Sequence, residues 1–184
     1  KQTVLVGDVT LTVDLNIQME AERILNGLVQ KYNAAGGGVI VADPRSGKIL
    51  ALAGAPEFDP NIYQKSGIET FINPMVQEVY EPGSTVKTIT MAAGIDSGNI
   101  TPETPYVDKG SLTFNSRLIQ NYDFKQRGAY GEVTMTNVLE HSINTGAVFA
   151  QREIGRDIFK EYMERFGLGE KTGITLPGEV EGNL

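Results

Sequence analysis

Residues 80–87 read Tyr-Glu-Pro-Gly-Ser-Thr-Val-Lys, and apolar residues at helical spacing follow them. Because Pro82 and Gly83 interrupt regular structure, we predict that a helix begins at or near Ser84. The first backbone N–H groups of a helix are unpaired and favour negative charge. Ser84 would therefore lie where an alkoxide is stabilised, and Lys87 would lie one turn later on the same face.

This Ser-x-x-Lys spacing suits nucleophilic catalysis. A serine is a weak nucleophile near neutral pH and needs a base. A partly buried lysine, whose pKa is lowered by desolvation, can be that base. The alternative is structural, because serine commonly begins helices and lysine is common on exposed helix faces. Ser84 and Lys87 alone do not decide between these two interpretations.

A second group of polar residues, Ser142-Ile143-Asn144, lies between two segments that we expect to be helical. A short loop there would direct Ser142 and Asn144 into a cleft. Ser142 could then relay a proton between the lysine and a leaving group, and Asn144 could hold a substrate amide. Alone the pattern is weak, since serine and asparagine are ordinary loop and cap residues.

The order Ser-x-x-Lys and then Ser-x-Asn is the arrangement of the active-site serine penicillin-recognising enzymes. The surrounding sequence resembles penicillin-binding transpeptidases over residues 8–181, and it resembles most the monofunctional enzymes of elongation or division. Residues 80–87 match the family's Tyr-Glu-Pro-Gly-Ser-Thr-x-Lys run. Further similar segments are the domain entry at 11–18, the first hairpin at 43–52, Phe-Asp-Pro-Asn at 58–61, and the stretches 166–169 and 176–179.

The resemblance implies an α/β (α+β) fold, that of penicillin-binding proteins and serine β-lactamases. Residues 1–184 would form one partial transpeptidase domain: the helical part and the first hairpin of the central antiparallel sheet. The remaining C-terminal strands and a final helix are expected past residue 184, or a second chain or fragment would complete the sheet. Lys171-Thr172-Gly173 has the letters of the family's third motif. It follows Asn144 too soon, so we expect it to be a different segment.

For function, the resemblance implies a peptidoglycan D,D-transpeptidase. Ser84 would attack a stem peptide ending in D-Ala-D-Ala, Lys87 would take its proton, Ser142 would protonate the departing D-Ala, and Asn144 would bind the donor peptide. β-Lactam antibiotics would acylate Ser84. No cofactor or metal is implied. The 184 residues are expected to be inactive alone, since part of the cleft would be missing.

Two other classes of function remain open. A β-lactam-hydrolysing or β-lactam-sensing serine protein would share the first two motifs, and the rate at which the acyl group is released would distinguish it. A non-catalytic structural or partner-binding module would not be acylated. His141, the single histidine, is adjacent to Ser142 and suggests a catalytic triad. A histidine at a helix end is more often structural or solvated, which is what we expect here.

Composition narrows the remaining classes. The net charge is −7, and no basic stripe is visible, so no nucleic-acid partner is expected. The absence of cysteine excludes disulfides, thiolate catalysis and cysteine metal sites. No apolar run reaches ~18 residues, so any membrane anchor would lie outside these residues. The resemblance implies an extracytoplasmic location, in the periplasm or on the outer face of the cytoplasmic membrane.

The hydrophobic pattern predicts the order of elements. Asp14 is expected to cap a helix at 15–33, with Ile17, Ala21, Ile24, Leu25 and Leu28 on one face. The other predicted elements are a strand at 8–15, a hairpin of 39–42 and 48–53 covered on both faces, an irregular stretch at 54–83, a helix from Ser84 to Gly94 or Gly98, short strands within 99–131, and helices at 132–140 and 147–166.

Overall fold

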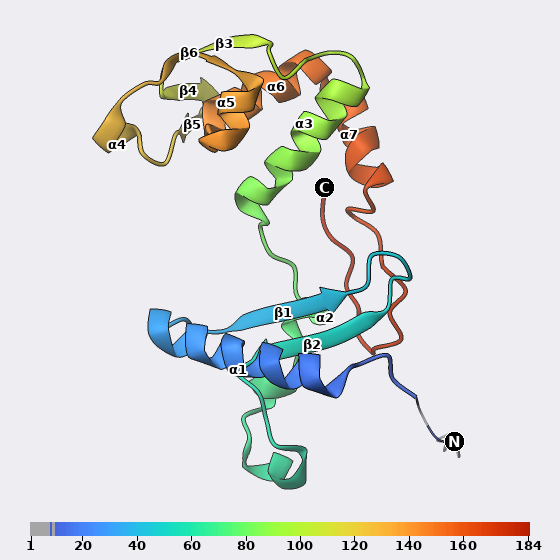
Figure 1. The fold of residues 1–184 in the computed structure, drawn as a ribbon. Coiled ribbons are helices and arrows are strands. Elements are labelled where there is room, and N and C mark those ends of the chain that lie inside the picture. The colour runs from blue at the N-terminus through green and yellow to red at the C-terminus, as the bar shows by residue number, and fades with distance from the viewer. Residues whose placement is uncertain (1–7, 9) are drawn as a thin grey trace. The chain divides into compact units, whose positions relative to one another are not determined.

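A computed structural model describes Asp8 and residues 10–184 and groups the chain into two compact units. The first unit extends to Glu78 and includes Leu176–Val180, and the second contains Val79–Thr175 and Glu181–Leu184. Each unit has its own cluster of buried apolar side chains. Helices and small antiparallel sheets are both present (Figure 1), in agreement with the predicted mixed class. The expectation of a single partial domain stays a prediction.

The first unit is a helix packed on a β-hairpin. Helix α1 (Leu15–Tyr32) contacts strands β1 (Gly37–Ala42) and β2 (Ile49–Ala55), which pair antiparallel as predicted (Figure 1). The side chains that β2 turns inward are all alanines, so the helix approaches the strands closely. The buried residues are Ala21, Leu25, Ala51, Ala53 and Ala55.

The start of α1 follows the prediction, and its buried face follows it in part. The Asp14 carboxylate accepts hydrogen bonds from the backbone N–H of Asn16 (2.9 Å) and Ile17 (3.1 Å), so Asp14 caps the helix. Ile24 and Leu28, which we expected in the core, are each 45% exposed. The hairpin instead covers positions spaced four apart, from Ile17 through Ala21 and Leu25 to Val29, because these residues form one narrow stripe.

Two strand predictions in this unit are wrong. Asp8 and residues 10–14 form no strand, and Val9 lies outside the described residues. The Asp14 backbone N–H donates a hydrogen bond to Leu50 O of β2 (2.9 Å). Because Asp14 also caps α1, the chain enters the helix immediately afterwards and does not pair further with β2. Strand β1 is not covered on both faces: its exposure alternates, and Ile40 is 51% exposed.

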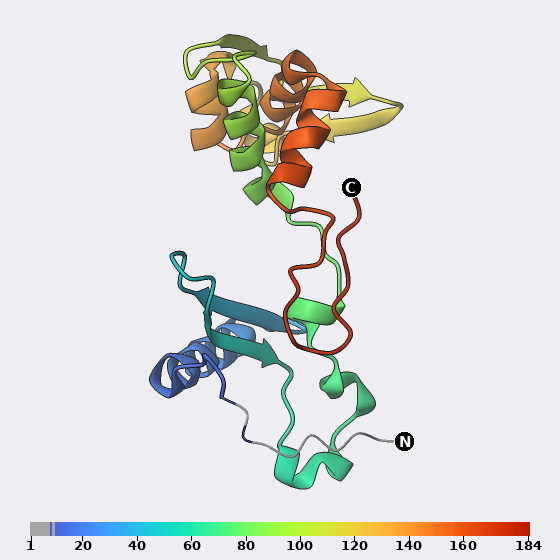
Figure 2. The same cartoon turned by 90° about the vertical axis from the view of Figure 1, so that its right-hand side faces the viewer.

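The segment predicted to be irregular consists of short helical turns joined by loops. They are η1 (Pro60–Lys65), η2 (Ile68–Phe71) and α2 (Pro74–Gln77). The Asp59 carboxylate and the Asn73 side-chain carbonyl accept hydrogen bonds from backbone N–H groups at the first turns of η1 and α2. Since the Val180 N–H donates to Val76 O (3.0 Å), the 176–180 segment belongs with this unit (Figure 2).

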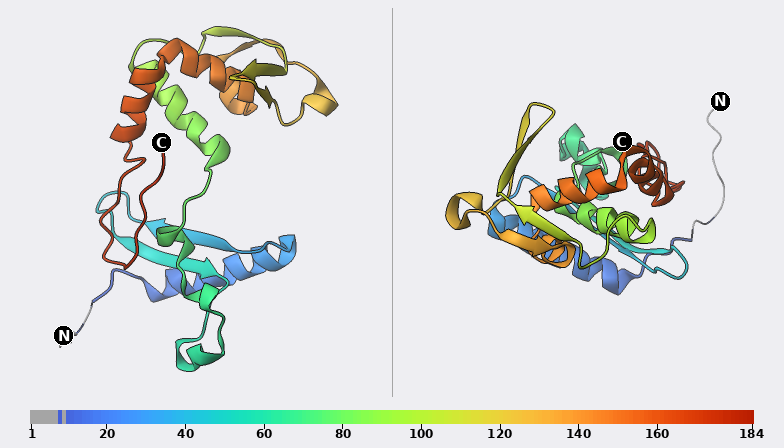
Figure 3. Two further views of the ribbon diagram at one scale, coloured as in Figure 1. Left: turned by 180° about the vertical axis from the view of Figure 1, so that it is seen from behind. Right: turned by 90° about the horizontal axis from the view of Figure 1, so that it is seen from above.

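The second unit is built on packed helices. Helix α3 (Val86–Asp96), preceded by the turn η3 (Gly83–Thr85), contacts α6 (Asn144–Ile154) and α7 (Arg156–Arg165), as the views in Figure 3 show. Helix α5 (Met135–Glu140) packs on α3 and α6. The buried core consists of Met91, Ile100, Met135, Val138, Ile143 and Ala150. Within the described residues, no helix combines the length and apolar character needed to cross a membrane.

Short strands flank these helices, as predicted for residues 99–131. They form two separate antiparallel pairs, which Figure 2 shows beside the helices. Strand β3 (Pro105–Asp108) pairs with β6 (Gly131–Thr134), and β4 (Ser111–Phe114) pairs with β5 (Arg117–Gln120). The single helical turn α4 (Phe124–Arg127) lies in the connection between β5 and β6.

Two predicted helices of this unit have different bounds. The 132–140 helix begins only at Met135, because Val133 pairs with Tyr106 in the β3–β6 sheet. Thr134 then forms a capping box with Asn137 that starts α5. The predicted 147–166 helix begins earlier, at Asn144, and is divided into α6 and α7 by Gly155, whose φ is +83°.

Two glycine substitutions should change stability in opposite directions. A Cβ at Gly146 would overlap the buried Val138 side chain, whereas a Cβ at Gly27 would meet no atom within 4 Å. We expect Gly146→Ala to lower the free energy of unfolding by about 1–3 kcal/mol through overpacking. Gly27→Ala, the matched control in a helix interior, should raise it by up to about 1 kcal/mol. Urea unfolding measures both, and equal effects would contradict this account of the α5–α6 contact.

Candidate active site

Ser84 and Lys87 lie where η3 continues into α3. Gly83, with φ at +63°, begins the turn, and Ser84 is its middle residue. Regular α-helix starts two residues after Ser84, close to the predicted start. Lys87, in the first turn of α3, is only 8% exposed, and its Nζ lies 3.3 Å from Ser84 Oγ. The serine and the lysine predicted as nucleophile and base therefore face each other.

Ser142 lies in the short connection between α5 and α6, and Asn144 is the first residue of α6. Ser142 has φ of +53°, in the left-handed region that non-glycine residues rarely adopt. Backbone hydrogen bonds hold it there, from Ser142 N–H to Leu139 O (3.2 Å) and from Ile143 N–H to Val138 O (2.9 Å). Ile143 is fully buried beside them and anchors the connection in the core.

The Lys87 amine brings the four predicted residues into one cluster. Its Nζ donates to the Ser142 carbonyl oxygen (2.6 Å), to Asn144 Oδ1 (2.6 Å) and to Ser142 Oγ (2.9 Å). Ser142 Oγ donates in turn to Ser84 Oγ at 3.0 Å. The structure thus joins two segments that lie more than fifty residues apart in the sequence.

These contacts fix the direction in which the amine can accept a proton. The Ser142 carbonyl and the Asn144 Oδ1 can only accept hydrogen bonds, so each requires an N–H of Lys87. A neutral amine has two N–H groups and one lone pair. In this neutral form the lone pair is left for the other two neighbours of Nζ, the hydroxyls of Ser84 and Ser142, which then donate to the amine instead of accepting from it.

The surroundings of Lys87 shift its amine towards this neutral form. Burial lowers the pKa of the Lys87 amine, because desolvation penalises its charged state. The groups that contact Nζ closely are a carbonyl, a hydroxyl and a side-chain amide, none of which carries a charge. A buried lysine among neutral acceptors is suited to act as a general base.

The other residues considered from the sequence lie elsewhere. The His141 ring stacks on Tyr130, with centroids 5.2 Å apart and planes 22° from parallel, and Lys87 is the basic group placed next to Ser84. Residues 171–173 are exposed and belong to no strand. Among the described residues, no group of three or more histidines and carboxylates is arranged to hold a metal ion.

The groups that hold Asn144 in place could not be predicted from the sequence. Its Nδ2 donates to the Gln120 carbonyl oxygen (2.8 Å), which turns Oδ1 towards Lys87. The next residue, Thr145, is fully buried and bonds to Asp108 and Asn121. These partners are scattered over separate strands and turns, and each resembles an ordinary turn residue in sequence, so only the fold brings them together.

Known proteins resemble this chain in sequence and in fold. The peptidoglycan D,D-transpeptidase MrdA of Escherichia coli (strain K12) is 34% identical over 190 residues, covering 96% of this chain and 29% of MrdA. The peptidoglycan D,D-transpeptidase FtsI homolog of Mesostigma viride is 34% identical over 163 residues, covering 86% of this chain and 27% of the homolog. The chain thus spans less than a third of the length of these relatives.

A solved structure and a family model complete the comparison. The crystal structure of a peptidoglycan glycosyltransferase from Burkholderia ambifaria superposes with a TM-score of 0.80 and 27% identity, covering 95% of this chain and 50% of that one. The predicted fold class is therefore confirmed. The model of the penicillin binding protein transpeptidase domain matches residues 37–184. The chain belongs to this family, the penicillin-binding protein transpeptidases.

Proposed function

We propose that the polypeptide carrying this chain is a serine D,D-transpeptidase that cross-links peptidoglycan stem peptides outside the cytoplasm. The main support is the Lys87 amine, which contacts Ser84, Ser142 and Asn144 at once. Two curated relatives are named peptidoglycan D,D-transpeptidases, which supports the same activity here.

In the first half-reaction Ser84 becomes acylated. Ser84 Oγ attacks the carbonyl carbon of the penultimate D-Ala, and its proton moves to the lone pair of Lys87 Nζ. The proton then passes through Ser142 Oγ, which lies 2.9 Å from Nζ and 3.0 Å from Ser84 Oγ, to the nitrogen of the terminal D-Ala. The C–N bond breaks, free D-Ala leaves, and an ester to Ser84 remains.

In the second half-reaction an amine of another stem peptide attacks this ester. Its surplus proton returns through the Lys87–Ser142 pair to Ser84 Oγ as the C–O bond breaks. The products are a new peptide bond and the original serine. Asn144, whose amide orientation is set by Gln120 and Lys87, contributes its free Nδ2 hydrogen to bind the donor peptide.

The same chemistry explains why β-lactam antibiotics should bind this site. Opening of the lactam ring by Ser84 forms the same ester, but the amine that leaves stays covalently attached to the acyl group. Slow release of the acyl group from Ser84 after reaction with a β-lactam supports a transpeptidase. Rapid release would identify a β-lactam-hydrolysing enzyme instead.

Acylation by a fluorescent penicillin should depend on Ser84 and be independent of His141. In the full polypeptide that carries these residues, Ser84→Ala should abolish covalent labelling because no nucleophile remains. His141→Ala, the control, should label within a few-fold of the wild type. Gel fluorescence with intact-mass analysis measures both. Labelling that survives in Ser84→Ala, or is lost only in His141→Ala, would refute the assignment.

The acylation rate should rise with pH through the lowered pKa of Lys87. Since only the neutral amine accepts the Ser84 proton, the rate is low below this pKa and reaches a plateau above it. Burial lowers the pKa of Lys87, so the midpoint should fall below the ordinary lysine value of about 10.4. Stopped-flow acylation between pH 6 and 10 tests this.

A charged replacement provides the control for that profile. Lys87→Arg keeps a positive charge at every pH of the experiment and cannot act as a base. We expect it to reduce acylation by at least about 100-fold, within the usual contribution of general base catalysis. A variant rate equal to that of the wild type would exclude Lys87 as the base, and a wild-type midpoint at or above the ordinary lysine value would contradict the effect of burial.

A further inference from the structure

Asp108, the last residue of β3, is a buried carboxylate that the proposed reaction does not use. It is 2% exposed, and the groups that donate to it are uncharged. An unpaired buried carboxylate is costly unless hydrogen bonds satisfy it. The donors are the backbone N–H of Gly110 (2.9 Å) and Tyr130 (2.8 Å), Asn121 Nδ2 (3.0 and 3.1 Å) and Thr145 Oγ1 (2.5 Å).

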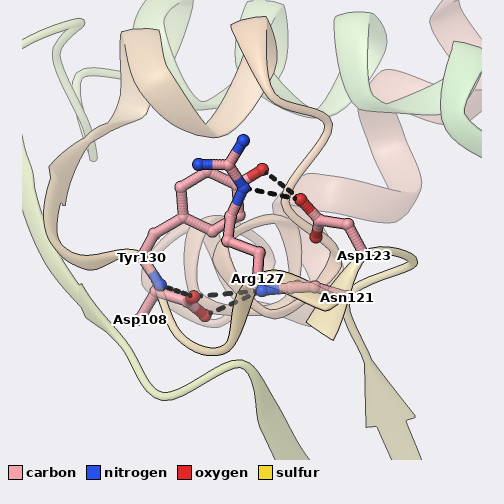
Figure 4. Close-up of polar contacts among 5 residues, drawn as sticks. All are labelled: Asp108, Asn121, Asp123, Arg127 and Tyr130. Carbon is pink, nitrogen blue, oxygen red and sulfur yellow. Dashed lines mark hydrogen bonds and ion pairs between the residues drawn. The ribbon is translucent and has the colours of Figure 1, made fainter. Parts of the chain in front are cut away.

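These donors keep Asp108 ionised. Burial raises the pKa of the Asp108 carboxyl, but the hydrogen bonds outweigh burial and bring its pKa below the usual value. An ionised carboxylate only accepts hydrogen bonds. The two oxygens of Asp108 accept all of the hydrogen bonds given above. Figure 4 shows Asn121 and the Tyr130 backbone nitrogen converging on it. Asp108 thus joins four segments of the second unit.

Two of these segments hold Asn144. Thr145, the next residue, donates its hydroxyl to Asp108 and its backbone N–H to Asn121 Oδ1 (3.2 Å). Asn121 donates its amide to Asp108, and its neighbour Gln120 accepts the hydrogen bond from Asn144 Nδ2 (2.8 Å). Asn144 is therefore held in two ways, through the adjacent residue Thr145 and through its own side-chain amide. Both sets of hydrogen bonds lead to the Asp108 carboxylate.

A third segment extends towards Ser142. The Tyr130 backbone is held by Asp108, and its hydroxyl donates to Asp123 Oδ2 (2.7 Å). The Arg127 guanidinium lies 4.9 Å from the centroid of the Tyr130 ring, and the His141 ring stacks on the same ring. Figure 4 shows the part of this network around Tyr130. Since His141 precedes Ser142, the same carboxylate supports both ends of the Ser-x-Asn motif.

We propose that Asp108 is a positioning residue of the active site, whose carboxylate holds Asn144 Oδ1 against Lys87 Nζ through Thr145 and Asn121. This role rests on the proposed function, because it concerns the residues assigned to acylation. Asp108 is not a catalytic residue: it acts through Asn144 and contacts no reacting atom. When the carboxylate network is broken, Asn144 should move away from the amine, and acylation should slow while the pre-acylation binding of the penicillin changes little.

The test compares Asp108→Asn with changes at Thr145 in the full polypeptide. Asparagine is nearly isosteric but directs an NH2 group at donors that need an acceptor. Thr145→Val removes the hydroxyl donor at constant shape, and Thr145→Ser restores it. A misplacement of about 1 Å can cost 100-fold in rate, so we expect a 10- to 100-fold lower acylation rate constant in the first two variants. Thr145→Ser should stay within about 3-fold of the wild type.

Asp96→Asn is the matched control, since this carboxylate also accepts a hydrogen bond from a tyrosine hydroxyl, that of Tyr162 (2.6 Å), but takes no part in the Asp108 network. It should change acylation by less than about 3-fold. Crystal structures give a second readout: the Lys87 Nζ to Asn144 Oδ1 separation, 2.6 Å here, should exceed hydrogen-bonding distance in Asp108→Asn and Thr145→Val and remain in Thr145→Ser.

Normal acylation with an intact Lys87–Asn144 contact in both disrupting variants would overturn the positioning role. If Asp108→Asn does not fold, the Thr145→Val and Thr145→Ser pair decides. If the wild-type protein is not acylated at all, the proposed function fails, whereas the Nζ to Oδ1 distance in the variant structures still decides whether Asp108 positions Asn144.

Discussion

The second unit depends on how one buried amine is accommodated. Among the described residues, no carboxylate is a hydrogen-bond partner of Lys87 Nζ, so the charge of the amine has to be stabilised by neutral oxygens or lost. Those oxygens come from the α5–α6 connection, whose backbone the core holds. The position of Lys87 on α3 therefore depends on the packing of α5 and α6. A change in that packing would remove the oxygens that accept hydrogen bonds from the amine.

The packing beneath the site supports this arrangement. Met91 of α3, Val138 of α5 and Ile143 of the connection belong to one buried cluster. Gly146 lets α6 approach Val138 closely, which brings the first turn of α6 against α5. Side chains on rigid elements keep a reactive geometry better than side chains on free loops. The first unit, with its alanine-lined hairpin, is stabilised by a separate core.

The sequence predicted the local features that depend on neighbouring residues. The Asp14 cap, the hairpin around residues 43–47 and the helix after Ser84 follow from spacing, capping and turn chemistry. The errors arose where distant contacts decide the outcome. Val133 became part of a strand because Tyr106 pairs with it, and Ile24 is exposed because the hairpin covers a narrower stripe.

The candidate site also contains residues that the sequence predicts and residues that only the fold reveals. Ser84, Lys87, Ser142 and Asn144 were found because short motifs carry them, and the fold then placed them within hydrogen-bonding distance. Asp108, Asn121 and Thr145 belong to no motif, since their relation exists only through hydrogen bonds across β3, the end of β5 and α6. Sequence spacing contains no information about such a network.

The left-handed backbone of Ser142 has a consequence for the evolution of this site. A non-glycine residue in this region costs about 1 kcal/mol or more relative to glycine, so mutation towards glycine would be favoured by folding alone. Serine at this position lowers the free energy of unfolding relative to glycine, but it places a hydroxyl 3.0 Å from Ser84 Oγ. Selection for a more stable protein and selection for the proton relay that we propose for Ser142 would therefore act in opposite directions on this residue.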